Sequence, residues 1–193
     1  GMDDAGRDFC VDLDRIVVPH AIFIGATGSG KTTTAMSFAK QLARLGVRTV
    51  AIDPHGHWAR FPGAHVVDAR EYAPPIASIA EEDIDLLLDV LRAAGVQVLD
   101  VHFTVLLNAV QRCGGSLRQL PECLLKARDL SNAWAVDAIY GRLYTLAQLR
   151  SASVPASHVV VHTGGDTGPS ARMRLLLWLL WAVTEAKRTC PKP

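Results

Sequence analysis

Eight residues near the start of the chain combine the residue types that bind the phosphates of a nucleotide. The segment from Gly25 to Thr32 reads Gly-Ala-Thr-Gly-Ser-Gly-Lys-Thr and matches the pattern G-x-x-x-x-G-K-[ST]. Glycines permit positive φ angles and a close backbone approach, so that successive N–H groups can surround an anion. The lysine and threonine that end the segment supply a positive charge and a hydroxyl ligand for magnesium. The pattern therefore predicts a nucleoside triphosphate site, with ATP and Mg²⁺ as its ligands.

Each position of this phosphate loop has a predicted role. Lys31 is the predicted catalytic residue, because its ammonium group would neutralise the β- and γ-phosphate oxygens. The Thr32 hydroxyl group would complete the coordination of the magnesium ion, and Thr33 could hydrogen-bond the α-phosphate. The predicted nucleotide-binding residues are Gly25, Ala26, Thr27, Gly28, Ser29, Gly30, Lys31, Thr32 and Thr33. An ordinary glycine-rich turn is the alternative, and the complete eight-residue match argues against it.

A second polar cluster follows the next apolar segment and reads Asp-Pro-His-Gly-His, from Asp53 to His57. The carboxyl ends of parallel strands border the ligand crevice of open α/β sheets, so Asp53 could hold a magnesium-bound water there. It could equally cap the turn ahead of Pro54, and the sequence leaves both roles open. His55 and His57 lack a third ligand at metal-binding spacing, which favours ordinary loop residues.

Hydrophobic patterning predicts an α/β fold around these residues. Apolar segments at 21–24 and 47–52 flank a helix predicted over 31–45, which gives a βαβ unit. Further strands are predicted at 65–67 and 158–162. The predicted fold class is a P-loop NTPase (RecA-like), in which helices flank a parallel sheet.

Four helices are predicted between residues 78 and 150, as an insertion into this frame. The first would begin with a capping box of Ser78 and Glu81 and stop at Gly95. The others are predicted over 99–112, 117–127 and 134–149. A last helix is predicted over 170–187, with Ser170 as its N-cap. We expect one ATPase core domain over 1–193, divided into a P-loop part (1–77), the helical insertion (78–150) and a return strand and helix (151–193).

Composition limits the class of protein. The chain has 193 residues, of which 49% are hydrophobic and 20% charged, which is typical of a globular fold. A net charge of +1 predicts that any DNA contact would come from a local patch or an assembled ring. Four scattered cysteines indicate free thiols in a reduced, cytoplasmic protein. The longest apolar segment, residues 175–183, is far shorter than the roughly 20 residues that span a bilayer, so no membrane segment is expected.

Two separated motifs resemble the HerA/FtsK superfamily of ring-forming ATPases, in its HerA-like and conjugative-transfer branches with a DUF87-type central domain. His20–Thr32 looks like the strand and phosphate loop of that family, and Val50–Gly56 is similar to its Asp-Pro-His-Gly element. Val11–Asp14 and Val159–Arg188 resemble it more weakly. The resemblance implies a homo-oligomeric, hexameric motor that translocates or unwinds double-stranded DNA, with ATP at the subunit interfaces.

The sequence departs from the family pattern at two points. His57 stands where the family usually has glutamate, and no apolar strand ending in Asp-Glu occurs in the chain. We therefore expect a truncated chain that lacks the Walker B strand, and hydrolysis by this chain alone stays open.

A secretion or pilus-type ATPase, acting on protein subunits, is an alternative for the same loop. A nucleotide-binding module without hydrolysis is another.

Overall fold

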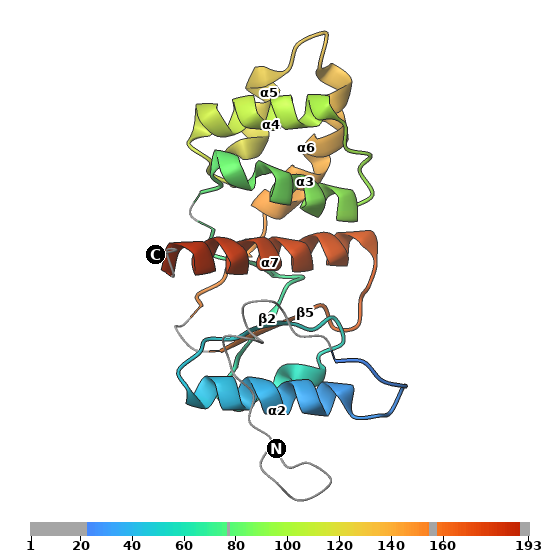
Figure 1. Cartoon of the computed structure of the whole chain (residues 1–193). Coiled ribbons are helices and arrows are strands. Elements are labelled where there is room, and N and C mark those ends of the chain that lie inside the picture. Colours follow the sequence, from blue (N-terminus) through green and yellow to red (C-terminus); the bar gives the residue numbers. More distant parts are fainter. Residues whose placement is uncertain (1–22, 77, 155–157, 190–193) are drawn as a thin grey trace, which may run out of the picture. The chain divides into compact units, whose positions relative to one another are not determined.

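The computed structural model describes residues 23–76, 78–154 and 158–189. These residues belong to two compact units that divide between Leu45 and Gly46 (Figure 1). Because the two units are separate bodies, each one is described by itself.

The first unit contains the phosphate loop and helix α2 (Lys31–Arg44), which confirms the helix predicted over 31–45. The predicted strand at 21–24 has a different outcome. Its first two residues lie outside the described part of the chain, and Phe23 and Ile24 have no regular secondary structure. A strand needs a hydrogen-bonded neighbour, and the described part of this unit offers none to these two residues. Instead, Phe23 packs against Phe38 of α2, with 6.0 Å between the ring centroids.

The second unit contains a parallel sheet in the order β1–β5–β2. The three strands are β1 (Val50–Ile52), β5 (Val159–His162) and β2 (His65–Asp68). Val50 and His65 both pair with Val159, which fixes the register on each side of the central strand. The three valines of β5 are buried, as expected for a strand with neighbours on both sides.

Helices form the rest of the second unit. Their bounds are η1 (His57–Arg60), η2 (Glu81–Asp83), α3 (Ile84–Ala93), α4 (Asp100–Cys113), α5 (Leu120–Ala127), α6 (Ala133–Ala147) and α7 (Pro169–Thr189). A two-stranded parallel pair, β3 (Tyr72–Ala73) and β4 (Arg150–Ser151), links the chain entering α3–α6 to the chain leaving them. The small parallel sheet flanked by helices confirms the predicted α/β class and is compatible with a P-loop NTPase fold.

Helix α7 lies between the sheet and the helices α3–α6 (Figure 1). Toward the sheet, Leu175, Trp178 and Trp181 pack with Val159 and Val161. Toward the helices, another set of α7 side chains joins the larger core: Met173, Leu177 and Leu180. Because both sides of α7 are covered, its sequence is apolar nearly all round. Among the described residues, no helix is long and apolar enough to cross a membrane.

Two predicted helix starts are wrong. Ser78 and Glu81 form no capping box, because the chain first makes the 3-10 turn η2 and α3 begins at Ile84. The Glu81 carboxylate instead accepts a hydrogen bond from Gln111 of α4 at 3.3 Å. Ser170 does not cap α7, which already begins at Pro169. Proline suits the first helical position, because its φ is fixed near the helical value and its missing N–H has no partner there.

Two of the four cysteines fall in the described part of the chain, and both are free thiols. Cys113 ends α4 and Cys123 lies in α5. Burial, together with the neighbouring Cys123, raises the pKa of the Cys113 thiol to about 11. At neutral pH this thiol therefore stays protonated and behaves as a packing group.

Candidate nucleotide-binding site

The phosphate loop folds back on itself at the start of α2 (Figure 1). Gly28 and Gly30 have φ angles of +82° and +84°, a region that residues with a Cβ rarely adopt. The Ser29 N–H donates to the Ala26 carbonyl at 3.2 Å. The Lys31 ammonium group donates to the same carbonyl at 2.5 Å. The ammonium group is therefore held over the loop whose backbone would surround the phosphates.

The first turn of α2 presents unpaired backbone donors beside this loop. Gly30 is the N-cap and provides no side-chain cap, and the first turn carries no acidic residue. The first intrahelical bond runs from the Thr34 N–H to the Gly30 carbonyl at 2.9 Å, so the N–H groups of Lys31, Thr32 and Thr33 precede it. Such donors and the positive end of the helix dipole favour an anion. Thr32 is exposed, whereas the Thr34 hydroxyl donates to the Gly30 carbonyl at 3.1 Å.

Asp53 belongs to the second unit, where it follows β1 and is buried. Its N–H donates to the Val161 carbonyl at 2.8 Å, which extends the ladder between β1 and β5. One of its carboxylate oxygens accepts a hydrogen bond from the Trp58 N–H at 2.7 Å. This contact caps η1, which is the turn-capping role that the sequence left open. A role in magnesium binding stays a prediction.

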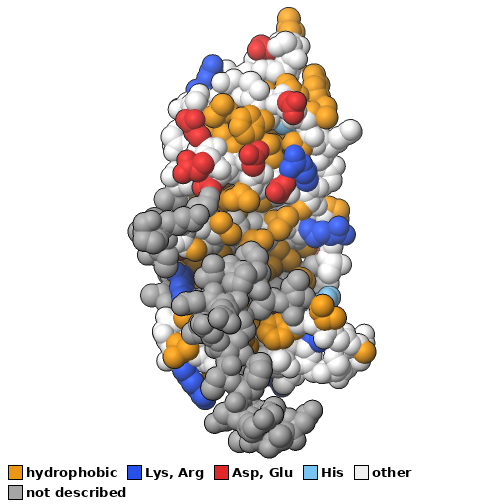
Figure 2. Space-filling model, viewed as in Figure 1, with side chains coloured by type: hydrophobic (Ala, Val, Ile, Leu, Met, Phe, Trp, Pro, Cys, Tyr) orange, Lys and Arg blue, Asp and Glu red, His pale blue; other side chains and the backbone are white. Residues whose placement is uncertain are grey.

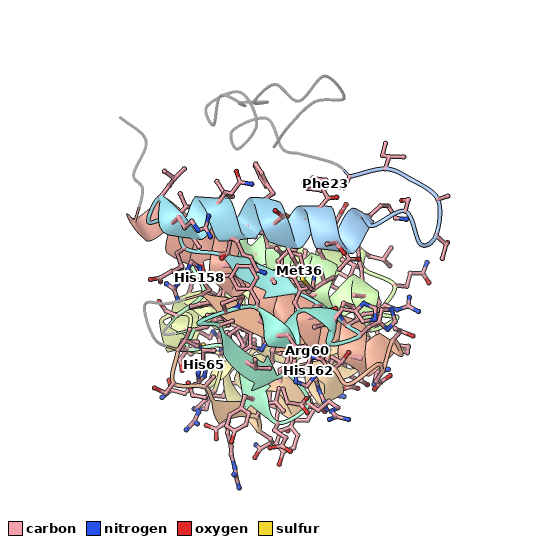
Figure 3. All side chains as sticks on the ribbon, turned by 90° about the horizontal axis from the view of Figure 1, so that it is seen from below. Phe23, Met36, Arg60, His65, His158 and His162 are labelled. Carbon is pink, nitrogen blue, oxygen red and sulfur yellow. The ribbon has the colours of Figure 1, made fainter. Side chains whose placement is uncertain are left out.

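The loops after β1 and β5 are tied together at the carboxyl end of the sheet. The Gly165 N–H donates to the Pro54 carbonyl at 2.8 Å. The buried Thr163 hydroxyl group lies 2.6 Å from the Asp166 carbonyl and 3.3 Å from the Pro54 carbonyl, and can donate to either. His162 marks this carboxyl end in Figure 3, whereas His158 and His65 mark the amino ends of β5 and β2.

An ion pair that the sequence did not predict lies at the end of β2, at the same end of the sheet. The Arg70 Nε and Nη2 atoms donate to the two Asp68 carboxylate oxygens at 3.0 and 2.5 Å. The hydrogen bonds from Arg70 hold the pKa of the Asp68 carboxyl below its ordinary value, although partial burial opposes them. A Cβ built on Gly164 would lie 3.0 Å from the Arg70 guanidinium carbon, so Arg70 covers the turn after β5. The Asp-Ala-Arg segment directly after the strand predicted over 65–67 is the sequence signal for this pair.

The two histidines beside Asp53 do not form a metal site with the other described residues. The rings of His55 and His57 lie 5.6 Å apart. In the ranges that the structure describes, no group of three or more histidine, cysteine, aspartate or glutamate side chains could hold a metal ion. The nine predicted nucleotide-binding residues thus gather in the first unit, and Asp53 lies at the sheet of the second.

A glycine-rich loop that opens a helix, in a chain with a small parallel sheet, fits the class of P-loop nucleotide-binding proteins. The sequence profile of the family described as Helicase HerA, central domain (DUF87) matches residues 2–143, which is most of the chain. The chain belongs to this family and is thereby an ATPase of the HerA/FtsK type. Comparison with curated proteins and with solved structures gives no match.

The range that the family profile matches differs from the segments whose motifs resemble the family. It includes the phosphate loop and the Asp-Pro-His-Gly element, and it continues through α3, α4 and α5 into α6. It ends before β5 and α7, where the sequence shows a weaker resemblance. The helices α3–α5 therefore belong to the region that defines the family match.

Proposed function

We propose that this chain is the ATP-binding core of a ring-forming, ATP-driven DNA translocase or helicase of the HerA-like type. The observation that carries the proposal is the geometry of the phosphate loop at the start of α2. Gly28 and Gly30 have positive φ angles there, and the Lys31 ammonium group is held over the loop by the Ala26 carbonyl. The family membership supports ATP as the nucleotide. The whole chain would then serve as one ATPase core domain, in the cytoplasm, with the homo-oligomer as the working form.

The residues of the loop fit magnesium-bound ATP. Backbone N–H groups from Gly25 to Thr33 would surround the phosphates, and Lys31 would leave the Ala26 carbonyl to neutralise the β- and γ-oxygens. The exposed Thr32 hydroxyl group would hold the magnesium ion, which when bound screens the phosphate charge. Asp53 is a further candidate for a magnesium-bound water, in competition with its hydrogen bond to Trp58.

Rapid hydrolysis requires a general base. The family pattern places it in the Asp-Glu pair at the end of an apolar strand, and this chain contains no such strand. A glutamate that activates the attacking water typically contributes a factor of about 10²–10⁴ in rate. Because no apolar strand ending in Asp-Glu occurs in the 193 residues, we expect ATP binding without rapid turnover by this chain alone.

Double-stranded DNA is the proposed partner, and a hexamer the proposed assembly. Figure 2 shows acidic side chains gathered over the helical part of the visible face. In the same part of the chain, Arg128 pairs with Asp137 at 2.9 Å. DNA would therefore contact a different surface, which in a ring would be the one that faces the channel.

Binding of ATP tests the first half of the proposal. Isothermal titration of the chain with ATP and Mg²⁺ should show a single site, and Lys31→Ala should weaken binding by about tenfold or more, because a charged contact to phosphate is lost. Lys40→Ala is the matched control, since Lys40 is an exposed lysine of the same helix outside the loop. Equal affinities of the two variants would contradict the assigned site.

DNA-stimulated hydrolysis tests the second half, and it is measured on the homo-oligomer of a full-length protein that includes a Walker B strand. ATP turnover should rise when linear double-stranded DNA is added, and Lys31→Ala should abolish the rise. Wild-type ATP binding without any DNA effect would contradict a translocase and favour a nucleotide-binding module.

A further inference from the structure

A cleft of about 150 Å³ lies in the second unit, where the chain enters and leaves the helices α3–α6. Its walls come from the β3–β4 pair, from the turn between α4 and α5, and from the end of α6. The apolar part of its lining includes Ile76, Leu117, Leu146 and Leu149. Because Leu117 and Leu146 are buried members of the larger core, the cleft reaches the apolar interior of this unit.

Hydrogen bonds and core packing fix the walls of this cleft. Beside the β3–β4 pair, the Ala152 N–H donates to the Ala73 carbonyl at 2.8 Å. The Ile79 N–H donates to the Gly115 carbonyl at 2.8 Å, which joins the turn before α5 to the segment before α3. Leu146 is buried in the larger core and holds the end of α6. The cleft is therefore formed in advance, so binding would cost little ordering of the chain.

Three polar side chains line the same cleft, and all three carry hydrogen-bond donors. They are the hydroxyl groups of Ser116 and Ser151 and the guanidinium group of Arg118. Within the described ranges 23–76, 78–154 and 158–189, none of these side chains has a hydrogen bond or an ion pair. The described residues that line the cleft include no aspartate or glutamate. A planar, charged guanidinium beside two hydroxyl groups suits the two oxygens of a carboxylate.

We propose that this cleft binds a small carboxylate whose apolar body is about as large as a benzene ring. Arg118 would pair with the carboxylate, and Ser116 and Ser151 would donate to its remaining lone pairs. The apolar body would pack against the leucines of the lining. An apolar cavity of about 150 Å³ is known to hold a benzene-sized molecule, which sets the size of that body. This inference concerns the second unit and does not depend on the proposed nucleotide site.

Simpler ligands would use only one part of the lining. Inorganic phosphate would satisfy Arg118 but would leave the leucines in contact with water. A hydrocarbon would cover the leucines but would offer no acceptor to the guanidinium group or to the two hydroxyl groups. A carboxylate with a compact apolar body meets both requirements, since such sites combine apolar walls with a few polar groups that orient the ligand.

Titration of the isotope-labelled intact chain with small carboxylates, followed by NMR, tests the proposal. The probes are benzoate and 3-methylbutanoate, and we expect saturable shifts of the Ser116, Arg118 and Ser151 amide signals. Benzamide has the ring without the charge, and acetate has the charge without the apolar body. Each of these two should bind about tenfold more weakly than benzoate, or worse, because one set of contacts is lost. No saturable shift with either probe would overturn the proposal, and so would equal affinities for benzoate and benzamide.

Variants of the lining residues locate the site. Arg118→Ala should weaken benzoate binding by about tenfold or more, and Arg118→Lys should restore part of the loss, because it keeps the charge without the planar fork. Arg142→Ala is the matched control, since Arg142 is an exposed arginine of α6 outside the cleft. Ala147→Leu enlarges a lining side chain and should block benzoate.

The phosphate loop is the other place where an anion could bind, and Lys31→Ala separates the two. This variant should bind benzoate as the wild type does, because Lys31 belongs to the first unit. Wild-type affinity in both Arg118→Ala and Ala147→Leu would overturn the proposal. Benzoate shifts that are confined to the phosphate loop and disappear in Lys31→Ala would also overturn it.

Discussion

The Asp53 carboxylate accepts a hydrogen bond from the backbone N–H of Trp58 at 2.7 Å, and this contact occupies one oxygen of a predicted magnesium ligand. Asp53 is buried at the end of β1, where its own N–H continues the ladder to β5. The residue thus connects the sheet to the turn that follows it. A structural role and a metal-binding role of the Asp53 carboxylate predict different effects of mutation on stability and on magnesium binding.

Asp53→Ala should destabilise the fold by about 1–3 kcal/mol, because the Trp58 N–H would lose its partner in a part-buried place. Asp53→Asn should cost much less, since an amide oxygen can still accept that bond. Urea unfolding of both variants measures the difference. If Asp53→Asn also keeps the magnesium dependence of ATP binding, the carboxylate charge has no role at the metal.

Two threonines of the same helix provide a paired test of the magnesium site. Thr32→Val should weaken binding of ATP by roughly tenfold when Mg²⁺ is present and have little effect in its absence, because only a metal ligand is lost. Thr34→Val should leave both affinities unchanged, since the Thr34 hydroxyl donates to Gly30 within the helix. Nucleotide titrations with Mg²⁺ or with EDTA distinguish these outcomes. A loss that is the same under both conditions would assign Thr32 to phosphate contact or folding.

Gly115 should tolerate no side chain. Its φ is +75°, and a Cβ built there would lie 2.1 Å from the Ile79 carbonyl oxygen. The Ile79 N–H donates to the Gly115 carbonyl at 2.8 Å, so the two backbones cannot separate without breaking that bond. Gly114→Ala is the control, because Gly114 also has a positive φ but open space at its Cβ position. We expect a loss of about 1 kcal/mol for the control from φ alone, and a clearly larger loss for Gly115→Ala. Similar unfolding midpoints for the two variants would contradict the close approach.

The Asp68–Arg70 pair should make a small, pH-dependent contribution to stability. Because the pKa of Asp68 is lowered in the folded chain, its contribution is present above the unfolded pKa and is lost as the pH falls through the folded pKa. Asp68→Asn should therefore lower stability slightly near pH 7, within the range of exposed ion pairs, and match the wild type at strongly acidic pH. Thermal melts of both proteins between pH 7 and strongly acidic pH provide the comparison. A difference that does not shrink in acid would point to packing instead of charge.

Much of the local structure could be predicted from the sequence. The phosphate loop is a contiguous pattern. The helices over 31–45, 99–112 and 134–149 follow from apolar periodicity, and glycines stand just beyond the ends of the first two. These signals lie between residues close in the chain, where backbone preference and helix geometry act directly. The predicted starts of α3 and α7 are wrong, because Ser78 and Ser170 are not the only residues in these segments that can begin a helix. α7 begins one residue earlier, at Pro169, and Glu81 contacts Gln111 of α4 instead of taking part in a capping box.

The tertiary structure alone decided which distant residues meet. Trp178 donates its indole N–H to the Tyr72 carbonyl at 3.2 Å, and Thr163 contacts the Pro54 carbonyl, although each pair is more than a hundred positions apart in the chain. No periodicity encodes such contacts, because they depend on the order β1–β5–β2 and on how α7 packs between the sheet and the helices. By itself, the sequence determined the loop for the phosphates and the class of fold. Packing determined that Asp53 accepts a hydrogen bond from the turn that follows it and that Arg70 covers the turn after β5.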